Sequence, residues 1–270
     1  MTRFSITAIL LLLSLPTSPA LAEEMLFNSS AAIKEETTRI GNEAREFLRT
    51  TVDTEKNGLI GTVVVAGAAT LAYAFDDDIR DKVHSRKSWA LDKTAEIGSL
   101  LGNPFIHIGI VGAVYGGGII AKSPRYQETG LMLGEALFLA DASTFILKEA
   151  IGRERPLVTG DKGRFSPLQF KANSDSLPSM HTASSFAMAS VLAANTDSVS
   201  TKLLCYSAAA FVGLARIYQD EHWASDVIVG AAIGELSGRV VAIYHQSHGK
   251  IAIAPMVAAK GAGLGLVGRW

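Results

Sequence analysis

The sequence predicts an all-α fold, a helical bundle of about six core helices. Strongly apolar stretches, each of roughly 13–19 residues, follow one another with short polar breaks between them. No regular alternation of apolar and polar residues appears before residue 250, so no strand is predicted there. The six stretches are Gly58–Phe75, Pro104–Ala121, Thr129–Leu147, Thr182–Ala194, Leu203–Tyr218 and Val227–Tyr244.

Residues 1–22 are predicted to be a secretory signal peptide rather than part of the fold. Arg3 supplies a positive charge, Ile6–Leu15 is a short apolar segment, and Ala20–Ala22 forms a small-x-small cleavage site. Cleavage is expected before Glu23. An uncleaved anchor helix is the alternative, although the apolar segment is shorter than the ~20 residues that a span needs.

Residues 23–57 are predicted to form an N-terminal amphipathic helix and a linker. Ser29 or Ser30 can cap a helix that runs to about Thr50. One face of this helix is charged and the other is apolar, with a helical spacing. The apolar face carries Ile33, Ile40, Ala44 and Phe47.

The helical domain is expected to cover residues 58–248 and to be followed by a different kind of tail, residues 249–270. In the tail, apolar residues alternate on both sides of Lys260-Gly261, which predicts a small C-terminal β-hairpin. Its terminal aromatic residue, Trp270, is also typical of the last strand of an outer-membrane barrel, but one such strand cannot close a barrel.

The composition excludes several classes of protein. Because 48% of the residues are hydrophobic, the chain can bury a sizeable core and is not intrinsically disordered. The formal net charge of −1 provides no excess of positive charge for binding nucleic acid, which argues against a nucleic-acid-binding protein. The one cysteine, Cys205, cannot form an internal disulfide, and no Cys/His spacing for zinc is present.

The first polar cluster follows the third apolar stretch. It contains Lys148, which closes that stretch, and Arg155, which comes two helical turns later and directly precedes Pro156. If the helix continues, both cations can face one pocket. Capping of the helix dipole by cations is the simpler interpretation.

The second cluster, Pro178–Thr182, opens the fourth apolar stretch. Backbone N–H groups at the start of a helix favour an anion, and Ser179 and His181 would add a hydroxyl and an imidazole. An ordinary N-cap by Ser179 is the alternative.

The third cluster precedes the last stretch and contains Arg216, His222 and Asp226. The histidine and the aspartate are four residues apart, which places them on one face of a helix that begins near Trp223. Such a carboxylate can hold one imidazole nitrogen and leave the other free to attack. An exposed His–Asp pair of small energetic value is the alternative.

Together the clusters supply three cations, one hydroxyl, two histidines and a carboxylate at three helix ends. A phosphate monoester site requires such a set, because cations and N–H groups neutralise the phosphoryl oxygens while one histidine attacks and another protonates the leaving oxygen.

The chain resembles the type 2 phosphatidic acid phosphatase / vanadium haloperoxidase superfamily over roughly residues 58 to 244. The family pattern is K-x6-R-P, then P-S-G-H, then S-R-x5-H-x3-D. The corresponding residues here are Lys148 and Arg155-Pro156, then Pro178–His181, then Ala215-Arg216, His222 and Asp226.

This resemblance implies the roles of the site residues. His222 would be the nucleophile that forms a phosphohistidine, Asp226 would orient it, and His181 would be the general acid and then the base for water. The phosphoryl oxygens would be bound by Lys148, Arg155, Ser179, Arg216 and the Met180 N–H. The resemblance implies no metal and no cofactor, and vanadate is expected to bind as a phosphate mimic.

Two positions depart from the family pattern. Met180 replaces a glycine, which narrows the pocket mouth, and Ala215 replaces a serine and lacks its hydroxyl. Neither change removes a catalytic group, so we expect activity, and the two changes leave the substrate range open.

The expected function is hydrolysis of a phosphomonoester, either a phospholipid or prenyl phosphate or a soluble ester. A vanadium-dependent haloperoxidase and a non-catalytic envelope protein are the alternatives. If residue 23 lay outside the cytoplasm and all six stretches spanned a membrane, the clusters would face the cytoplasm, whereas related integral lipid phosphatases have an outward-facing site. We therefore expect an exported protein in the periplasm or on the periplasmic membrane surface, with a multi-pass inner-membrane protein as the alternative.

Other polar residues have simpler interpretations. Asp76, Asp77 and Asp78 are expected to be a solvated run after a helix. His107 is expected to be a hydrogen-bonded core residue, and His245 and His248 to lie beyond the last helix without matching metal ligands.

Overall fold

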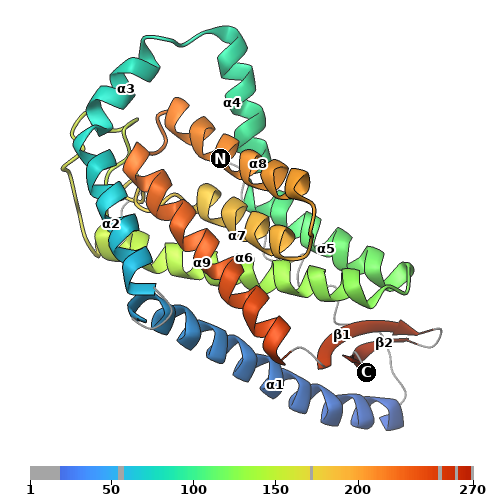
Figure 1. Cartoon of the computed structure of the whole chain (residues 1–270). Helices are drawn as coiled ribbons and strands as arrows, with labels where there is room; N and C mark the ends of the chain where they lie inside the picture. Colours follow the sequence, from blue (N-terminus) through green and yellow to red (C-terminus); the bar gives the residue numbers. More distant parts are fainter. Residues whose placement is uncertain (1–18, 54–57, 171–172, 249–250, 259–260, 269–270) are drawn as a thin grey trace.

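The computed structural model describes residues 19–53, 58–170, 173–248, 251–258 and 261–268. Within them the all-α class is confirmed, and each of the six apolar stretches forms a helix (Figure 1). Residues 1–18 of the predicted signal peptide lie outside the described residues. The helices are α1 (Pro19–Val52), α2 (Gly58–Ala74), α3 (Asp76–His84), α4 (Trp89–Leu101), α5 (Pro104–Ile120), α6 (Pro124–Ile151), α7 (Met180–Ala194), α8 (Val199–Tyr218) and α9 (Ala224–His248).

Some predicted helix bounds are wrong. The N-terminal helix begins at Pro19 rather than at Ser29 or Ser30. α6 and α9 have 28 and 25 residues, longer than predicted, because polar residues at their ends continue the helix. Consequently His245 lies within α9 and not beyond it.

α3 and α4 were not predicted from the sequence, because they are polar or short, although both have ordinary end signals. α3 begins with three aspartates and ends with Lys82 and His84, which suits the helix dipole. In α4, the Ser88 side chain accepts a hydrogen bond from the Leu91 N–H. These two helices connect α2 to α5 and contribute residues to the site described below.

The core surrounds α7, which packs against α6, α8 and α9 near the centre of the molecule (Figure 1). Small side chains dominate it, and α1 adds Phe47 from one side. The core includes Leu133, Ala136 and Ala140 of α6, Ala183, Ala187 and Val191 of α7, and Val240 and Val241 of α9.

A row of glycines brings α9 into backbone contact with α7. Gly230, Gly234 and Gly238 recur every four residues and therefore share one face of α9. A Cβ atom at Gly234 would lie 2.1 Å from the Ala183 carbonyl oxygen, and one at Gly230 would lie 2.5 Å from the Ser179 carbonyl oxygen. Any larger residue would therefore separate the two helices.

The outer surface of the bundle is strongly apolar. The structure places no buried residue in α2, and in α5 the side chains of Phe105 and Ile120 are more than four-fifths exposed. Among the described residues, α6 and α9 are long and apolar enough to span a membrane, and the bent pairs α2–α3 and α4–α5 add two more candidates. These features support membrane association of the chain.

Two strands follow α9. β1 (Ile251–Ala258) and β2 (Gly261–Gly268) pair in antiparallel fashion, with Ile251 opposite Gly268 and Ala258 opposite Gly261. β2 lies beside α1 (Figure 1).

Candidate active site

The three sequence clusters meet at one end of the bundle. The C-terminal ends of α6 and α8 bring Lys148 and Arg216, the start of α7 brings Ser179, and the residues around the start of α9 bring His222 and Asp226. All five side chains are buried. Contact between the starts of α7 and α9 is direct, because the Ser179 N–H donates to the Asp226 carbonyl at 3.0 Å.

Arg155 reaches the site from a loop and not from α6, so the expected continuation of that helix is wrong. α6 ends at Gly152, which has a φ of 63°. This left-handed conformation favours glycine, and a Cβ atom there would also lie 2.1 Å from the Ser166 carbonyl oxygen. The chain therefore turns, and the Arg155 N–H then donates to the Asn173 carbonyl at 3.0 Å.

His222 has a defined orientation. Its Nδ1 lies 2.7 Å from the carbonyl oxygen of Ser176 and 3.8 Å from Oδ2 of Asp226. Because a carbonyl can only accept, Nδ1 carries the proton and Nε2 keeps its lone pair. Asp226 acts on this arrangement through Ser176, whose hydroxyl donates to Asp226 Oδ2 at 2.5 Å. Ser176 was not identified as a site residue from the sequence.

A buried arginine holds Asp226 from the other side. Arg153 Nη1 donates to Asp226 Oδ1 at 2.6 Å, and its Nη2 donates to Asp76 Oδ2 at 2.8 Å. Asp76 also accepts from the Ser225 N–H and hydroxyl, at 3.0 and 2.6 Å. Asp76 is only 1% exposed, so its interpretation as part of a solvated run is wrong.

The start of α7 has the groups expected for an anion site. Ser179 stands at the N-cap position, yet its side chain makes no capping hydrogen bond and instead accepts from the Thr182 hydroxyl at 3.0 Å. Met180 and His181 are partly buried. His181 packs against Gly102, where an added Cβ atom would lie 3.3 Å from the imidazole ring.

Two acidic residues that the sequence analysis missed neutralise the cations. Asp175 accepts two hydrogen bonds from Arg155, both at 2.7 Å, and its backbone carbonyl accepts from Lys148 Nζ. Glu221 pairs with Arg155 and lies 3.4 Å from Arg216 Nη2. Hydrogen bonds from Arg155 and the charge of Lys148 outweigh burial and hold the pKa of Asp175 at about 2.

Arg216 retains an unused donor. Its Nη1 donates to Ser99 Oγ at 2.6 Å and to Gln219 Oε1 at 2.9 Å, whereas its buried Nε has no hydrogen-bond partner among the described residues. Buried donors are normally paired, so an oxygen of a ligand fits here. Ala215 packs against Gly98, and the adjacent Ser99 provides the hydroxyl that contacts Arg216.

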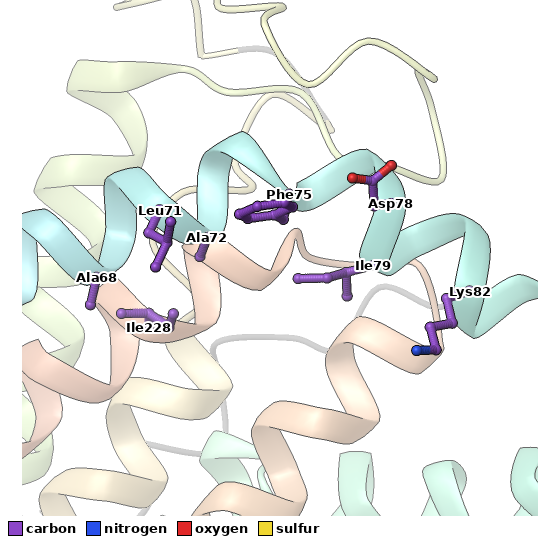
Figure 2. Close-up of a pocket in the computed structure, with 8 residues that line it drawn as sticks. All are labelled: Ala68, Leu71, Ala72, Phe75, Asp78, Ile79, Lys82 and Ile228. Atoms are coloured by element: carbon purple, nitrogen blue, oxygen red, sulfur yellow. The ribbon is translucent and has the colours of Figure 1, made fainter.

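A separate pocket lies outside this cluster. Figure 2 shows it on α2 and α3, with Ile228 of α9 on one side and Asp78 and Lys82 at the α3 end. Its lining is mostly apolar and includes none of the predicted site residues. The cluster of charged groups, and not this pocket, is therefore the candidate active site.

The two site histidines make the fold sensitive to acid. Burial, followed by the Arg216 and His222 charges, lowers the pKa of His181 to about 3, and burial lowers that of His222 to about 4. Both folded-state pKa values lie below the unfolded value of about 6.5, so below pH 6.5 the unfolded chain binds protons that the folded chain does not. The free energy of unfolding is therefore fully retained above pH 6.5 and decreases as the pH falls toward 4.

We expect the thermal unfolding midpoint to fall steadily between pH 6.5 and 4 and to fall less steeply in His181→Gln. Circular dichroism melts at several pH values measure this. Equal slopes for the wild type and the variant would contradict the assignment.

The Glu221 carboxylate pairs with Arg155 and Arg216, the two cations that a phosphate would otherwise contact. We expect Glu221→Gln to bind orthophosphate or vanadate about three- to tenfold more tightly, because the substitution removes a competing charge from Arg155 and Arg216. Isothermal titration measures the affinity. Glu96→Gln, which alters an exposed carboxylate on α4, is the control. Weaker binding in Glu221→Gln would mean that Glu221 positions the arginines.

Part of the chain matches the model of a known protein family. The model of the PAP2 superfamily matches residues 129–250, which carry all three clusters. This segment is therefore similar to the PAP2 superfamily. Of the residues given site roles from the sequence, each lies within the matched segment.

One curated protein and two solved structures are also similar to parts of this chain. An 80-residue segment, 29% of this chain, is 42% identical to a protein described as lipid A 1-phosphatase from Porphyromonas gingivalis and spans 18% of its length. Two solved structures share the fold. LpxE of Aquifex aeolicus aligns with a TM-score of 0.50 at 23% identity, covering 61% of this chain and 92% of LpxE. A transmembrane PAP2 type phosphatidylglycerolphosphate phosphatase from Bacillus subtilis aligns with a TM-score of 0.55 at 18% identity, covering 69% of this chain and 96% of its own.

Proposed function

We propose that the chain is a phosphatase that removes a phosphate monoester from a phosphorylated lipid, without a metal, through a phosphohistidine on His222. The observation that carries this proposal is the buried Nε of Arg216, which has no hydrogen-bond partner among the described residues. Arg216 and His222 both lie close enough to His181 for their charges to interact with it. A phosphoryl oxygen satisfies the Arg216 Nε.

In the first chemical step, the Nε2 lone pair of His222 attacks phosphorus and the bond from phosphorus to the substrate oxygen breaks. The Nδ1–H bond to Ser176 favours this tautomer before the substrate arrives. Lys148, Arg155 and Arg216 neutralise charge on the phosphoryl oxygens as it develops. The Met180 N–H and the Ser179 hydroxyl complete the oxygen site at the start of α7.

His181 acts on the leaving group. It gives a proton to the departing oxygen and then takes one from the water that hydrolyses the phosphohistidine. In the ligand-free site its pKa is low, because of burial and the neighbouring cations. A bound phosphate dianion counters those cations and raises the pKa toward the value that a general acid needs.

A lipid substrate is supported by the surface and by the relatives. The apolar outer faces of α2 and α5 suit contact with acyl chains. The relatives are described as a lipid A 1-phosphatase and a phosphatidylglycerolphosphate phosphatase. We further propose that residues 1–22 direct export and that the site works at the periplasmic membrane surface.

The test is a phosphate-release panel on purified mature protein, with and without detergent. Phosphatidate, phosphatidylglycerophosphate, a prenyl phosphate, lipid A and a soluble ester are compared. We expect release from at least one lipid phosphate and inhibition by vanadate. Activation by vanadate in the presence of halide and peroxide would instead indicate a haloperoxidase, and no release from any substrate would refute the proposal.

A further inference from the structure

A second buried cluster of ionisable groups lies where α1, α6 and α9 meet. It consists of Glu43 of α1, Glu135 of α6 and His245 of α9. Glu135 comes thirteen residues before Lys148 on α6, so it lies about 20 Å along that helix from the candidate active site. The cluster therefore belongs to the opposite part of the bundle and has no place in the phosphatase chemistry.

All three side chains are withdrawn from solvent. The exposed fractions are 2% for Glu43, 8% for Glu135 and 5% for His245. Their potential ligand atoms, one from each residue, all lie within 4.8 Å of one another. His245 Nε2 is 2.6 Å from Glu135 Oε2, and Arg39 pairs with the other oxygen of Glu135.

Glu43 supplies the observation that points to a ligand. Its Oε1 is buried and has no hydrogen-bond partner among the described residues. An acceptor in this position normally has a donor or a cation beside it. Arg39 and His245 both pair with Glu135, and the Glu43 carboxyl lies beside that second carboxyl group, so a bound cation would relieve the repulsion between the two.

We propose that Glu43, Glu135 and His245 bind one divalent transition-metal ion, with zinc as the preferred ion. Two carboxylate oxygens and one imidazole nitrogen are suitable ligands for Zn²⁺ or Mn²⁺, and a fourth position is left for water. Ligand atoms of a tetrahedral zinc site lie about 3.3 Å apart, which follows from bonds of about 2.0–2.1 Å. His245 Nε2 and Glu135 Oε2 are 2.6 Å apart and all three ligand atoms lie within 4.8 Å of one another, so the three groups are close enough to share one ion.

The ion would fasten α1 to the bundle. Apart from this cluster, the described side chains of α1 that join the hydrophobic core are Phe47 and Ala44. A bond from Glu43 to a metal shared with α6 and α9 adds a cross-link among helices that are far apart in sequence. Phosphate release at the other end of the bundle does not depend on it.

The test uses full-length protein without an affinity tag, stripped with EDTA, supplied with ZnCl₂ or MnCl₂ and then freed of excess metal. We expect about one equivalent of bound zinc by elemental analysis, with an unfolding midpoint several degrees higher than in the stripped protein. Glu43→Gln and His245→Gln should each lose the bound zinc and the rise. Glu235→Gln, which alters a partly exposed carboxylate on the same helix, should keep both.

Glu43→Gln decides the outcome if His245→Gln does not fold, because glutamine has the same shape and leaves no uncompensated charge. If the wild type retains no more zinc or manganese than Glu43→Gln, the proposal is wrong and a proton on Glu43 completes the cluster. Because metal content and midpoint are measured, this outcome is independent of phosphatase activity.

Discussion

Replacing His222 by alanine is expected to lower phosphate release from every substrate by roughly four orders of magnitude or more. The reason is that no other described side chain can take its place. His181, the other histidine of the site, belongs to a different helix, and Nδ1 of His222 is already held by the Ser176 carbonyl, which directs Nε2 toward the substrate. The rate is measured as phosphate released per enzyme, on the best substrate of the panel.

A trapping experiment separates loss of the nucleophile from general damage. Acid-labile, base-stable labelling of the wild type by a ³²P-substrate should be absent from His222→Ala. His84→Ala, which removes a partly exposed histidine of α3, should keep both labelling and turnover. Substantial turnover by folded His222→Ala would rule out His222 as the nucleophile.

Arg153→Ala is expected to lower the free energy of unfolding by about 3–5 kcal/mol and to reduce turnover strongly. Asp76 and Asp226 are essentially inaccessible, and without Arg153 both would remain buried with uncompensated charge. Asp226 would also lose the anchor that sets its contact with Ser176 and so, indirectly, with His222. Arg153→Lys should be intermediate, because lysine cannot bridge the two carboxylates with a planar fork.

Denaturant unfolding with a parallel activity assay measures this effect. Arg164→Ala provides the control, since Arg164 is 63% exposed and its pair with Glu154 is expected to contribute less than about 1 kcal/mol. Adding Asp76→Asn to Arg153→Ala should restore part of the lost stability, because one of the two buried charges disappears. Equal stability of Arg153→Ala and Arg164→Ala would contradict the role assigned to the network.

The site residues that could be predicted from the sequence were found from local patterns, namely helix ends and motif spacing. Lys148, Ser179, Arg216 and His222 all lie within a few residues of the end of an apolar stretch, so the helical pattern places them near helix ends. Motif spacing then relates them within each cluster. Arg155 shows the limit of this reasoning, because Gly152 ends α6 before the helix could reach it.

The parts that were missed depend on contacts between distant segments. Arg153 and Asp76 are 77 residues apart in the chain, and no periodicity connects them. Asp175 and Glu221 were visible as charges, but only the fold shows that they pair with Arg155. Likewise, Glu43, Glu135 and His245 come from three helices, and the sequence gives no sign that these helices converge.

The glycine row on α9 has a consequence for how this sequence can diverge. Since Gly230 and Gly234 hold α9 against main-chain atoms of α7, the spacing of the segments that carry His181 and His222 is set by peptide backbone. Substitutions on the outward faces of the bundle leave that spacing unaltered. The exposed apolar surface can therefore change by mutation while the geometry of the candidate active site is inherited unchanged.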